Sequence, residues 1–352
     1  MKVLLVSVKS ADAKGGIAVW TEHYLRGCKN IGIECDLVNT AVLGKNVKQT
    51  TLKRNFLEEL NRTRGIMKQL NHCLSNNDYK LAHLNTCIGL FGIIRDYYIA
   101  KKISRKGIPI VLHFHCDIPN WVNSFLVRVY LKKILRISSV NLVLCDSSYE
   151  FLKARRISSV KIANFVEENL IISHKEIRAE LSKVCYVGRI SAQKGANEIF
   201  EVAKQKPNIT FNLIGDISDE IKGKIIPSNV NCCGARSHEE VIAMLDDADV
   251  FLFPSHSEGF SLALAEAMSR GLPVIATDVG SVKEMIEDKG GVLIRPRQVG
   301  DIVEAIKSIY PAEVRTKMSE FNIWKVKENY TCSCVLNKLV EIYEQAIGET
   351  RK

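Results

Sequence analysis

The sequence predicts an α/β protein with two doubly wound domains, each built on a parallel sheet. Three observations support this fold class. The chain of 352 residues is too long for one ordinary core and suits two domains of about 150–180 residues. Its 46% hydrophobic and 25% charged residues are typical of a folded protein. Short β-branched runs alternate throughout with longer stretches of helical period, as in parallel sheets covered by helices on both faces.

In the first half, apolar runs predict buried strands at residues 2–8, 34–38, 81–84, 109–115 and 142–145. Stretches of helical period between them predict helices at 18–30, 56–73 and 95–106.

The second half repeats the scheme. We expect strands at residues 183–187, 210–214, 229–232, 250–253, 273–277 and 291–294, and helices at 196–205, 238–246, 261–270 and 300–310. The expected domains are 1–168 and 169–328, with the boundary near 164–173. Residues 329–352 would then carry a last helix, around 333–346.

Charge is distributed unevenly along the chain. Residues 1–170 carry 26 Lys and Arg against 13 Asp and Glu, whereas residues 171–352 carry 23 against 26. Such a basic half suggests contact with an anionic surface. Nucleic acid and acidic lipid both qualify, and because no nucleic-acid-binding motif is present we favour lipid over nucleic acid.

The eleven cysteines have no zinc-ligand spacing, and we interpret them as reduced, buried thiols. No run reaches the ~18–20 apolar residues that a membrane span needs. The short apolar run at the N-terminus predicts a first strand, not a signal peptide. We therefore expect a cytoplasmic protein.

The strongest motif runs from Pro254 to Glu266 and on to Pro273. Ser261 can cap a helix that ends at Gly271, which places Glu258 in the loop before this helix. The backbone amides of Gly259, Phe260 and Ser261 at the helix start form a potential diphosphate site. Glu266 lies among apolar residues, and burying its carboxylate requires a partner. A sugar diol would be such a partner; the alternative is a neighbouring Lys or Arg.

This motif resembles family 4 of the retaining glycosyltransferases, which have the GT-B fold. The two glutamates are separated by seven residues and followed by an Ala-Met…Gly-x-Pro-Val-Ile-Ala-Thr run. The segments 186–195, 211–216 and 249–255, with the glycine pair Gly15-Gly16, resemble further family motifs in the expected order. The resemblance is strongest over residues 183–296 and implies two Rossmann-like domains facing a central cleft, with the C-terminal helix crossing back to the N-terminal domain.

Two cations follow the predicted strand 183–187. Arg189 and Lys194 would stabilise the negative charge that grows on a departing nucleoside diphosphate, without a metal or other cofactor. A solvated pair is the alternative. Gly15 and Gly16 precede a helical stretch, where glycine permits close approach of the backbone to a phosphate, although a tight turn also needs glycine.

His113 and His115 end a predicted strand and point to one face. The family resemblance implies that His115 lines the sugar pocket, while His113 would support it. A metal site formed by His113, His115 and Asp117 is an alternative that lacks a fourth ligand. By the same resemblance Glu258 positions the reacting sugar and Glu266 holds the ribose. We expect donor specificity to depend on the loops near Gly215, Arg236 and His256.

The stretch 125–137 is basic and apolar with helical spacing, and Arg128, Lys132, Lys133 and Arg136 lie on one side. It is either an ordinary packed helix with a solvated face or a peripheral helix on anionic lipid.

The few aromatic residues and the basic first half favour a bacterial surface polysaccharide pathway: capsule, exopolysaccharide or lipopolysaccharide. The resemblance implies a retaining hexosyltransferase acting on a nucleoside-diphosphate sugar and a lipid-linked saccharide at the inner membrane surface. A GT-B-fold sugar-nucleotide epimerase and a non-catalytic protein of this fold are the alternatives.

Overall fold

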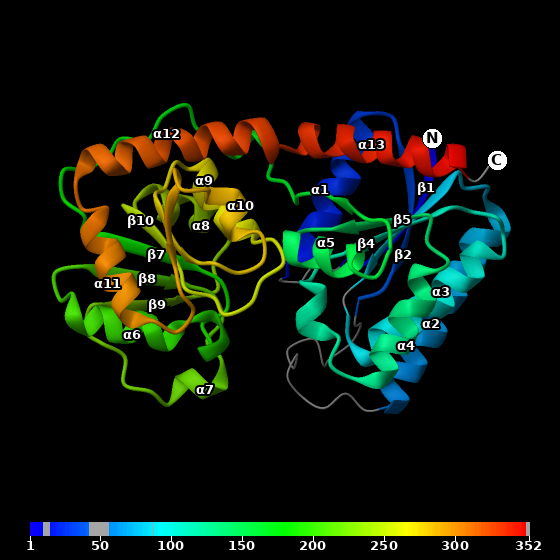
Figure 1. Ribbon diagram of the computed structural model, residues 1–352, viewed down its shortest axis with the longest axis horizontal. Coiled ribbons are helices and arrows are strands. Elements are labelled where there is room, and N and C mark those ends of the chain that lie inside the picture. The colour runs from blue at the N-terminus through cyan, green and yellow to red at the C-terminus, as the bar shows by residue number, and fades with distance from the viewer. Residues whose placement is uncertain (10–14, 42–55, 87, 350–352) are drawn as a thin grey trace. The chain divides into compact units, whose positions relative to one another are not determined.

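The computed structural model describes residues 1–9, 15–41, 56–86 and 88–349. They form two compact units. The first comprises Met1–Asn164 together with the segment that starts at Cys332, and the second comprises Phe165–Thr331. Each unit contains a six-stranded parallel sheet with helices on both faces, which confirms the predicted fold class (Figure 1).

The sheet of the first unit has the strand order β2-β1-β3-β4-β5-β6. Its strands are β1 (Lys2–Ser7), β2 (Glu34–Asn39), β3 (Leu81–Thr86), β4 (Ile110–Phe114), β5 (Val140–Val143) and β6 (Val160–Lys161). The helices are α1 (Gly16–Asn30), α2 (Phe56–Asn76), α3 (Leu90–Ser104), α4 (Phe125–Leu135), α5 (Asp146–Lys153) and α13 (Cys332–Glu349). The strand order reverses direction after β2, so right-handed crossovers place α1 on one face and α2–α4 on the other.

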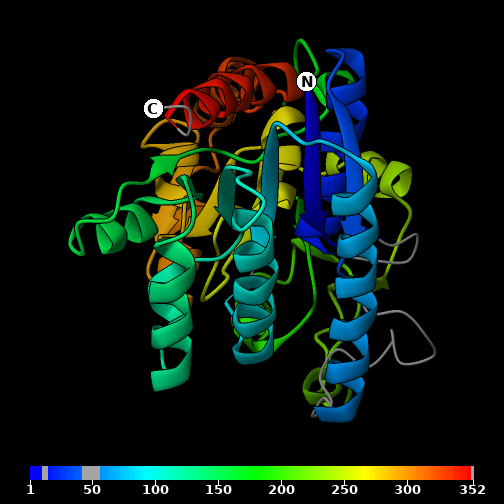
Figure 2. The same cartoon turned by 90° about the vertical axis from the view of Figure 1, so that its right-hand side faces the viewer.

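The two helical layers of this unit have separate roles. Helices α2, α3 and α4 pack side by side, in blue, cyan and green in Figure 2, over the core that includes Leu112 and Phe114 of β4. Helix α13 packs against α1 on the opposite face, where the hydroxyls of Tyr24 and Tyr343 lie 2.8 Å apart.

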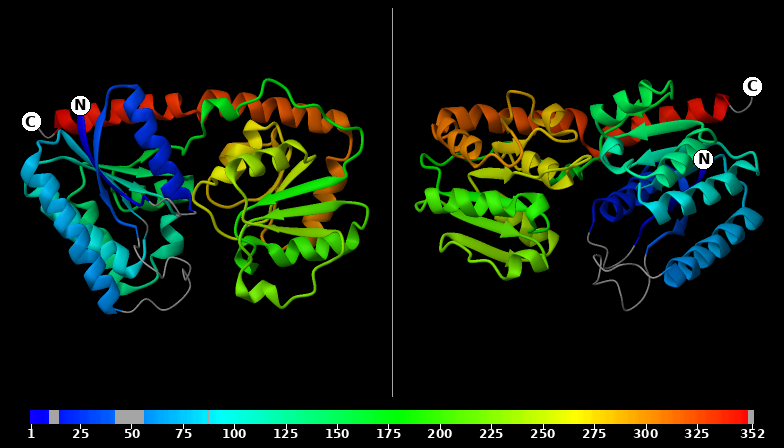
Figure 3. Two further views of the ribbon diagram at one scale, coloured as in Figure 1. Left: turned by 180° about the vertical axis from the view of Figure 1, so that it is seen from behind. Right: turned by 60° about the horizontal axis from the view of Figure 1, so that its bottom comes forward.

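The sheet of the second unit has the strand order β12-β11-β10-β7-β8-β9, which is the doubly wound order of dinucleotide-binding folds. Its strands are β7 (Lys183–Val187), β8 (Thr210–Ile214), β9 (Val230–Gly234), β10 (Val250–Phe253), β11 (Val274–Thr277) and β12 (Gly291–Ile294). The helices are α6 (Ala196–Gln205), α7 (Asp219–Lys222), α8 (His238–Asp246), α9 (Leu262–Ser269), α10 (Val282–Ile286), α11 (Val299–Ser308) and α12 (Ala312–Asn329). Figure 3 shows α6 and α9 against opposite faces of this sheet.

The sequence did not predict helix α12, because its buried stripe is mostly polar. Arg315, Ser319, Asn322 and Val326 are the buried residues of this helix, at helical spacing, and three of the four are polar. The Asn322 side chain donates to the carbonyls of Leu272 and Gly290, both at 2.8 Å. Such a helix has almost no apolar periodicity, although its polar side chains satisfy buried backbone carbonyls.

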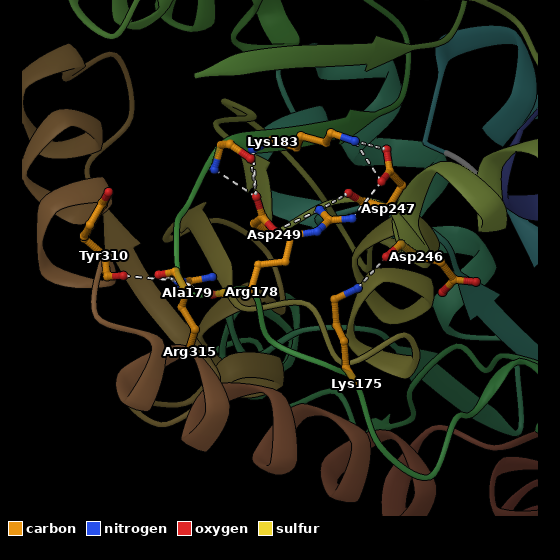
Figure 4. Close-up of polar contacts among 10 residues, drawn as sticks. Lys175, Arg178, Ala179, Lys183, Asp246, Asp247, Asp249, Tyr310 and Arg315 are labelled. Atoms are coloured by element: carbon orange, nitrogen blue, oxygen red, sulfur yellow. Dashed lines mark hydrogen bonds and ion pairs between the residues drawn. The ribbon is translucent and has the colours of Figure 1, made fainter. Parts of the chain in front are cut away.

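Polar groups also connect α12 to the start of β7 and β10 (Figure 4). Arg315 donates to the carbonyls of Arg178 and Ala179 at 2.8 and 2.9 Å. Asp249, which is 3% exposed, accepts from the amides of Ser182 and Lys183 at 2.9 and 2.8 Å. These contacts join segments that are far apart in sequence. They lie at the amino ends of β7 and β10.

Candidate functional site

The candidate site lies where the strand order of the second sheet changes direction. β7 and β10 are neighbours, but the chain leaves β7 toward β8 and leaves β10 toward β11, on opposite sides. The connections that leave their carboxyl ends therefore diverge, which makes this a topological switch point, where open α/β sheets bind ligands. The loop after β7 carries Arg189 and Lys194, and the loop after β10 carries Glu258.

Direct contacts hold these two loops together. The Lys194 ammonium forms an ion pair with the Glu258 carboxylate and lies 3.4 Å from the Ser257 carbonyl. The His256 amide donates to the Gln193 carbonyl at 3.0 Å. Lys194 and Glu258 are 30% and 13% exposed, so their charges interact away from bulk water while remaining reachable. The structure thus brings together two of the predicted site residues.

Two glycines permit this close approach. Gly195 has φ +81°, and a Cβ there would lie 2.6 Å from Cγ of Pro254. Gly280 has φ +59°, and a Cβ there would lie 2.6 Å from the Glu258 carbonyl oxygen. Both positions need the left-handed conformation and have no room for a side chain. The loop after β10 is therefore closely packed at Pro254 and at Glu258.

Helix α9 begins directly after Glu258. Its N-cap Ser261 accepts from the Leu264 amide at 3.2 Å, as the sequence predicts. Over the described part of the chain, the amides of Gly259, Phe260 and Ser261 donate to no protein acceptor. The Phe260 side chain is buried, with its ring centroid 5.4 Å from that of Tyr330. These amides and the positive end of the helix dipole can bind an anion.

Glu266 has a partner that the sequence did not predict. Its Oε1 lies 3.1 Å from Nε2 of His238, the first residue of α8, and the Glu266 side chain is largely buried. The hydrogen bond to Glu266 raises the pKa of His238, against a smaller opposing effect of burial. The partner is thus a histidine instead of the Lys or Arg we considered. The capping box Ser237-x-x-Glu240 marks the start of α8, but nothing local in sequence pairs it with α9.

A second histidine pair adjoins the Lys194 turn. His256 Nε2 lies 2.9 Å from the Glu198 carboxylate, and both side chains are largely buried. Glu198 belongs to the first turn of α6, directly after Gly195. We expected His256 to lie in a specificity loop; the structure shows that it also connects this loop to α6.

Arg189, by contrast, is exposed in the loop after β7, and its carbonyl accepts from the Tyr186 hydroxyl at 3.0 Å.

In the first unit, a chain of hydrogen bonds in which the donors can be assigned lies next to the predicted histidines. His83 Nε2 lies 3.0 Å from Asn85 Oδ1, which can only accept, so the His83 proton is on Nε2. His83 Nδ1 therefore accepts from the Tyr343 hydroxyl at 2.5 Å. Asn85 in turn donates to Ser7 at 2.8 Å, so this chain connects α13 to the end of β1.

The same logic fixes the tautomer of His113. Its Nδ1 lies 3.3 Å from the protonated Nε2 of His83 and accepts from it, so His113 carries its proton on Nε2. Burial lowers the pKa of His113 well below its usual value, and burial lowers those of His83 and His115 to about 3. All three rings are neutral at physiological pH. Within the described ranges, Nε2 of His113 and Nε2 of His115 have no protein partner.

The alternative of a metal site at these histidines has no geometric support. The Asp117 carboxylate accepts from Ser147 and Ser148 at 2.5 and 3.1 Å, and from Asn120 at 2.7 Å. It is therefore directed to α5 instead of the histidines. Among the residues that the structure describes, no group of three His, Cys, Asp or Glu side chains could hold a metal ion.

Gly15 and Gly16 start helix α1. Gly15 is the N-cap residue, in an extended conformation, and its carbonyl accepts from the amides of Ala18 and Val19 at 3.0 and 3.2 Å. No atom of the described residues lies within 4 Å of a Cβ built at either glycine. The Thr21 hydroxyl bonds the Ile17 carbonyl at 2.7 Å and also Ser7, which connects the turn to the histidine chain.

The second unit has the strand order of dinucleotide-binding α/β folds. Comparison with known families identifies it more closely: the model of the family "Glycosyl transferases group 1" matches residues 168–322. The match covers most of the second unit, Phe165–Thr331.

Three similar proteins illustrate the relationship. An uncharacterized 41.2 kDa protein in the cps region of Klebsiella pneumoniae is 28% identical over 295 residues, which cover 77% of this chain and 80% of that protein. Sucrose-phosphate synthase of Thermosynechococcus elongatus has a TM-score of 0.81 at 16% identity, over 99% of both chains. HepE of Anabaena, solved with UDP-glucose, has a TM-score of 0.72 at 17% identity, over 98% of this chain and all of that one. The solved structures show that the fold is GT-B.

Proposed function

We propose that the protein is a retaining glycosyltransferase of family 4 that transfers a hexose-type sugar from a nucleoside-diphosphate sugar to an acceptor hydroxyl. The observation that carries this proposal is the junction of Lys194, Glu258 and the start of α9 at the switch point of the second sheet. A cation, a carboxylate and three backbone amides converge there, which suits a diphosphate attached to a sugar. The family match and the UDP-glucose bound to HepE support a sugar-nucleotide donor.

We assign the roles as follows. The amides of Gly259, Phe260 and Ser261, with Arg189 and Lys194, would neutralise the diphosphate as its charge grows, so that no metal is required. Glu258 would orient the sugar and balance positive charge at the anomeric carbon. Because Lys194 bridges to Glu258, one ammonium would contact both the leaving group and the carboxylate.

The remaining donor contacts are also proposals. Glu266 would accept from the ribose hydroxyls, with His238 as its protein partner. Gly15, Gly16 and His115 of the first unit would contact the donor. His115 is neutral and can donate or accept a hydrogen bond to a sugar hydroxyl.

For the acceptor, we propose a lipid-linked saccharide of a bacterial surface polysaccharide. The relative from a cps region supports a capsule pathway, and the excess of basic residues in the first half supports an anionic membrane surface as a partner. No helix in the described ranges has the length and apolar character to cross a bilayer. We propose a cytoplasmic enzyme that is peripheral on the inner membrane face, in which nucleic acid has no role.

The donor is tested by thermal shift against UDP-, GDP- and dTDP-sugars. A ligand at 100 times its dissociation constant stabilises by about 2.7 kcal/mol, or roughly 5–10 °C in a unit of this size. Release of nucleoside diphosphate is then measured with and without a lipid-linked acceptor. Acceptor-dependent release indicates transfer, an isomerised donor indicates the epimerase, and binding without turnover indicates a non-catalytic protein.

Glu258→Ala tests the assignment of the site. We expect acceptor-dependent turnover to fall by roughly 10²-fold or more, because the carboxylate acts on the reacting sugar. Glu201→Ala is the matched control, since Glu201 forms an exposed ion pair with Lys204 on α6. A Glu258→Ala variant with near-normal turnover would refute the assignment.

A further inference from the structure

The packing of helix α4 excludes one mode of membrane binding. The apolar residues Val127, Leu131, Ile134 and Leu135 are buried in the core of the first unit. Helix α4 therefore cannot lie flat on a bilayer with this face inserted, as a peripheral amphipathic helix would. Its basic side chains, Arg128, Lys132, Lys133 and Arg136, are exposed.

Large apolar side chains are exposed instead at the N-terminal end of α4. Phe125 and Leu126 are 77% and 49% exposed, and Trp121, just before the helix, is 44% exposed. Leu90 and Phe91, the first residues of α3, are also exposed. An exposed phenylalanine is unremarkable alone, but a group of five large apolar residues at helix ends is unusual on a soluble surface.

The packing of α3 on α4 places these residues at one end of the pair. Both helices run from the carboxyl edge of a parallel sheet, so their N-termini lie at the same end (Figure 2). The Tyr97 and Tyr130 rings meet at 5.5 Å between centroids. Tyr97 lies about 10 Å beyond Leu90 along its helix, and Tyr130 lies about 8 Å beyond Phe125. The apolar ends therefore lie at similar heights, and we call these five residues, Leu90, Phe91, Trp121, Phe125 and Leu126, the apolar tip.

Behind the apolar tip lies a layer of tyrosine and lysine. Tyr98 and Tyr130 lie 6.4 Å apart between centroids, and the Lys133 ammonium lies 5.0 Å from the centre of the Tyr130 ring. Lys133 is about 12 Å from Phe125 along the helix. Along the helix axis the apolar end is thus followed by Arg128 and then by tyrosine and lysine, and such aromatic and basic side chains next to an apolar end are typical of a membrane interface.

The charge of this region suits an anionic surface. Helix α4 has no acidic residue, and the acid of α3, Asp96, is buried in an ion pair with Arg95. The exposed basic side chains of α4 are therefore not neutralised by acids on the two helices. Phosphate-rich headgroups would supply the missing counter-charge.

We propose that the first unit docks end-on to an anionic lipid bilayer, with the apolar tip inserted and the lysines and arginines of α4 at the headgroups. This inference deepens the proposed function by naming the surface that would reach a lipid-linked acceptor. Binding to lipid needs no turnover, so it can be tested even if the proposed reaction is wrong.

The test is co-sedimentation of the full chain with vesicles of phosphatidylcholine alone and of phosphatidylcholine with 30% phosphatidylglycerol, at low and high salt. The wild type should bind the anionic vesicles and lose affinity as salt rises. Phe125→Ser with Leu126→Ser should weaken binding at least tenfold, because two largely exposed apolar side chains no longer insert. Lys132→Glu with Lys133→Glu should weaken binding to anionic vesicles by more than tenfold.

Matched controls come from the second unit. Ile225→Ser removes a side chain that is 91% exposed, and Lys222→Glu with Lys224→Glu reverses two exposed charges; both should bind like the wild type. Melting temperatures of all variants should be unchanged, since only surface residues are altered. Failure of the wild type to bind anionic vesicles would overturn the proposal. So would loss of binding in the lysine variant but not in the apolar-tip variant, which would indicate a polyanion site. Equal loss in the controls would also overturn it.

Discussion

Gly195 is the position where one added methyl group should separate the two loops of the candidate site. The Cβ of alanine would overlap the backbone of Pro254 and would lie 2.6 Å from its Cγ. A normal contact needs more than 3.4 Å, so the turn that carries Lys194 must move by several tenths of an ångström or more. In addition, φ of +81° strains an alanine by roughly 1–2 kcal/mol.

We therefore expect Gly195→Ala to lower the free energy of unfolding of the second unit by about 2–3 kcal/mol. That corresponds to a fall of roughly 4–12 °C in melting temperature for a unit of this size. The larger effect should be on activity. A displacement near 1 Å of a charged group at the reacting centre can lower kcat/KM by about 10²-fold.

The assay is release of nucleoside diphosphate, with melting temperature measured on the same samples. Gly300→Ala is the control, because no atom of the described chain lies within 4 Å of a Cβ at this position of α11, and alanine favours a helix by up to about 1 kcal/mol. If Gly195→Ala kept kcat/KM within twofold while its melting temperature fell, the turn would not position Lys194. If neither quantity changed, the close packing on Pro254 would be wrong.

Two further predictions concern stability. Asp249→Ala should destabilise the second unit by about 2–5 kcal/mol, because two partly buried amides lose the acceptor that a buried carboxylate gives them, whereas Asp247→Ala should cost less than about 1 kcal/mol since its ion pairs are half-exposed. Equal effects of the two variants in chemical denaturation would contradict this ranking. The raised pKa of His238 means that its pairing with Glu266 stabilises the fold at low pH and is lost as pH rises through that pKa. His238→Gln should therefore lower the urea midpoint at pH 6 but not at pH 9, and a pH-independent difference would exclude the pairing.

The sequence predicted most strands and helices because their physical causes are local. The strands 183–187, 210–214, 250–253 and 291–294 and the helices 196–205 and 238–246 have the predicted bounds. The buried strands of a parallel sheet are continuous apolar runs, and glycine, proline and capping residues mark their ends. The loops that carry Arg189, Lys194 and Glu258 could be placed by the same reasoning, because each follows such a strand.

Only the tertiary structure decided which side chains meet. The pairs His238–Glu266 and His256–Glu198 join residues 28 and 58 positions apart, and no local pattern connects them. Helix α12 escaped prediction because its buried face satisfies backbone carbonyls through Arg315 and Asn322 instead of apolar contacts.

The basic helix predicted at 125–137 shows most clearly what the sequence determines and what only the tertiary structure decides. The sequence determined its amphipathic pattern, but only packing decided that the apolar face belongs to the core and that Phe125 and Leu126 are exposed at its end. The periodicity of the sequence indicates that one face of the helix is apolar. Which surface this face packs against depends on the long-range packing of the whole chain.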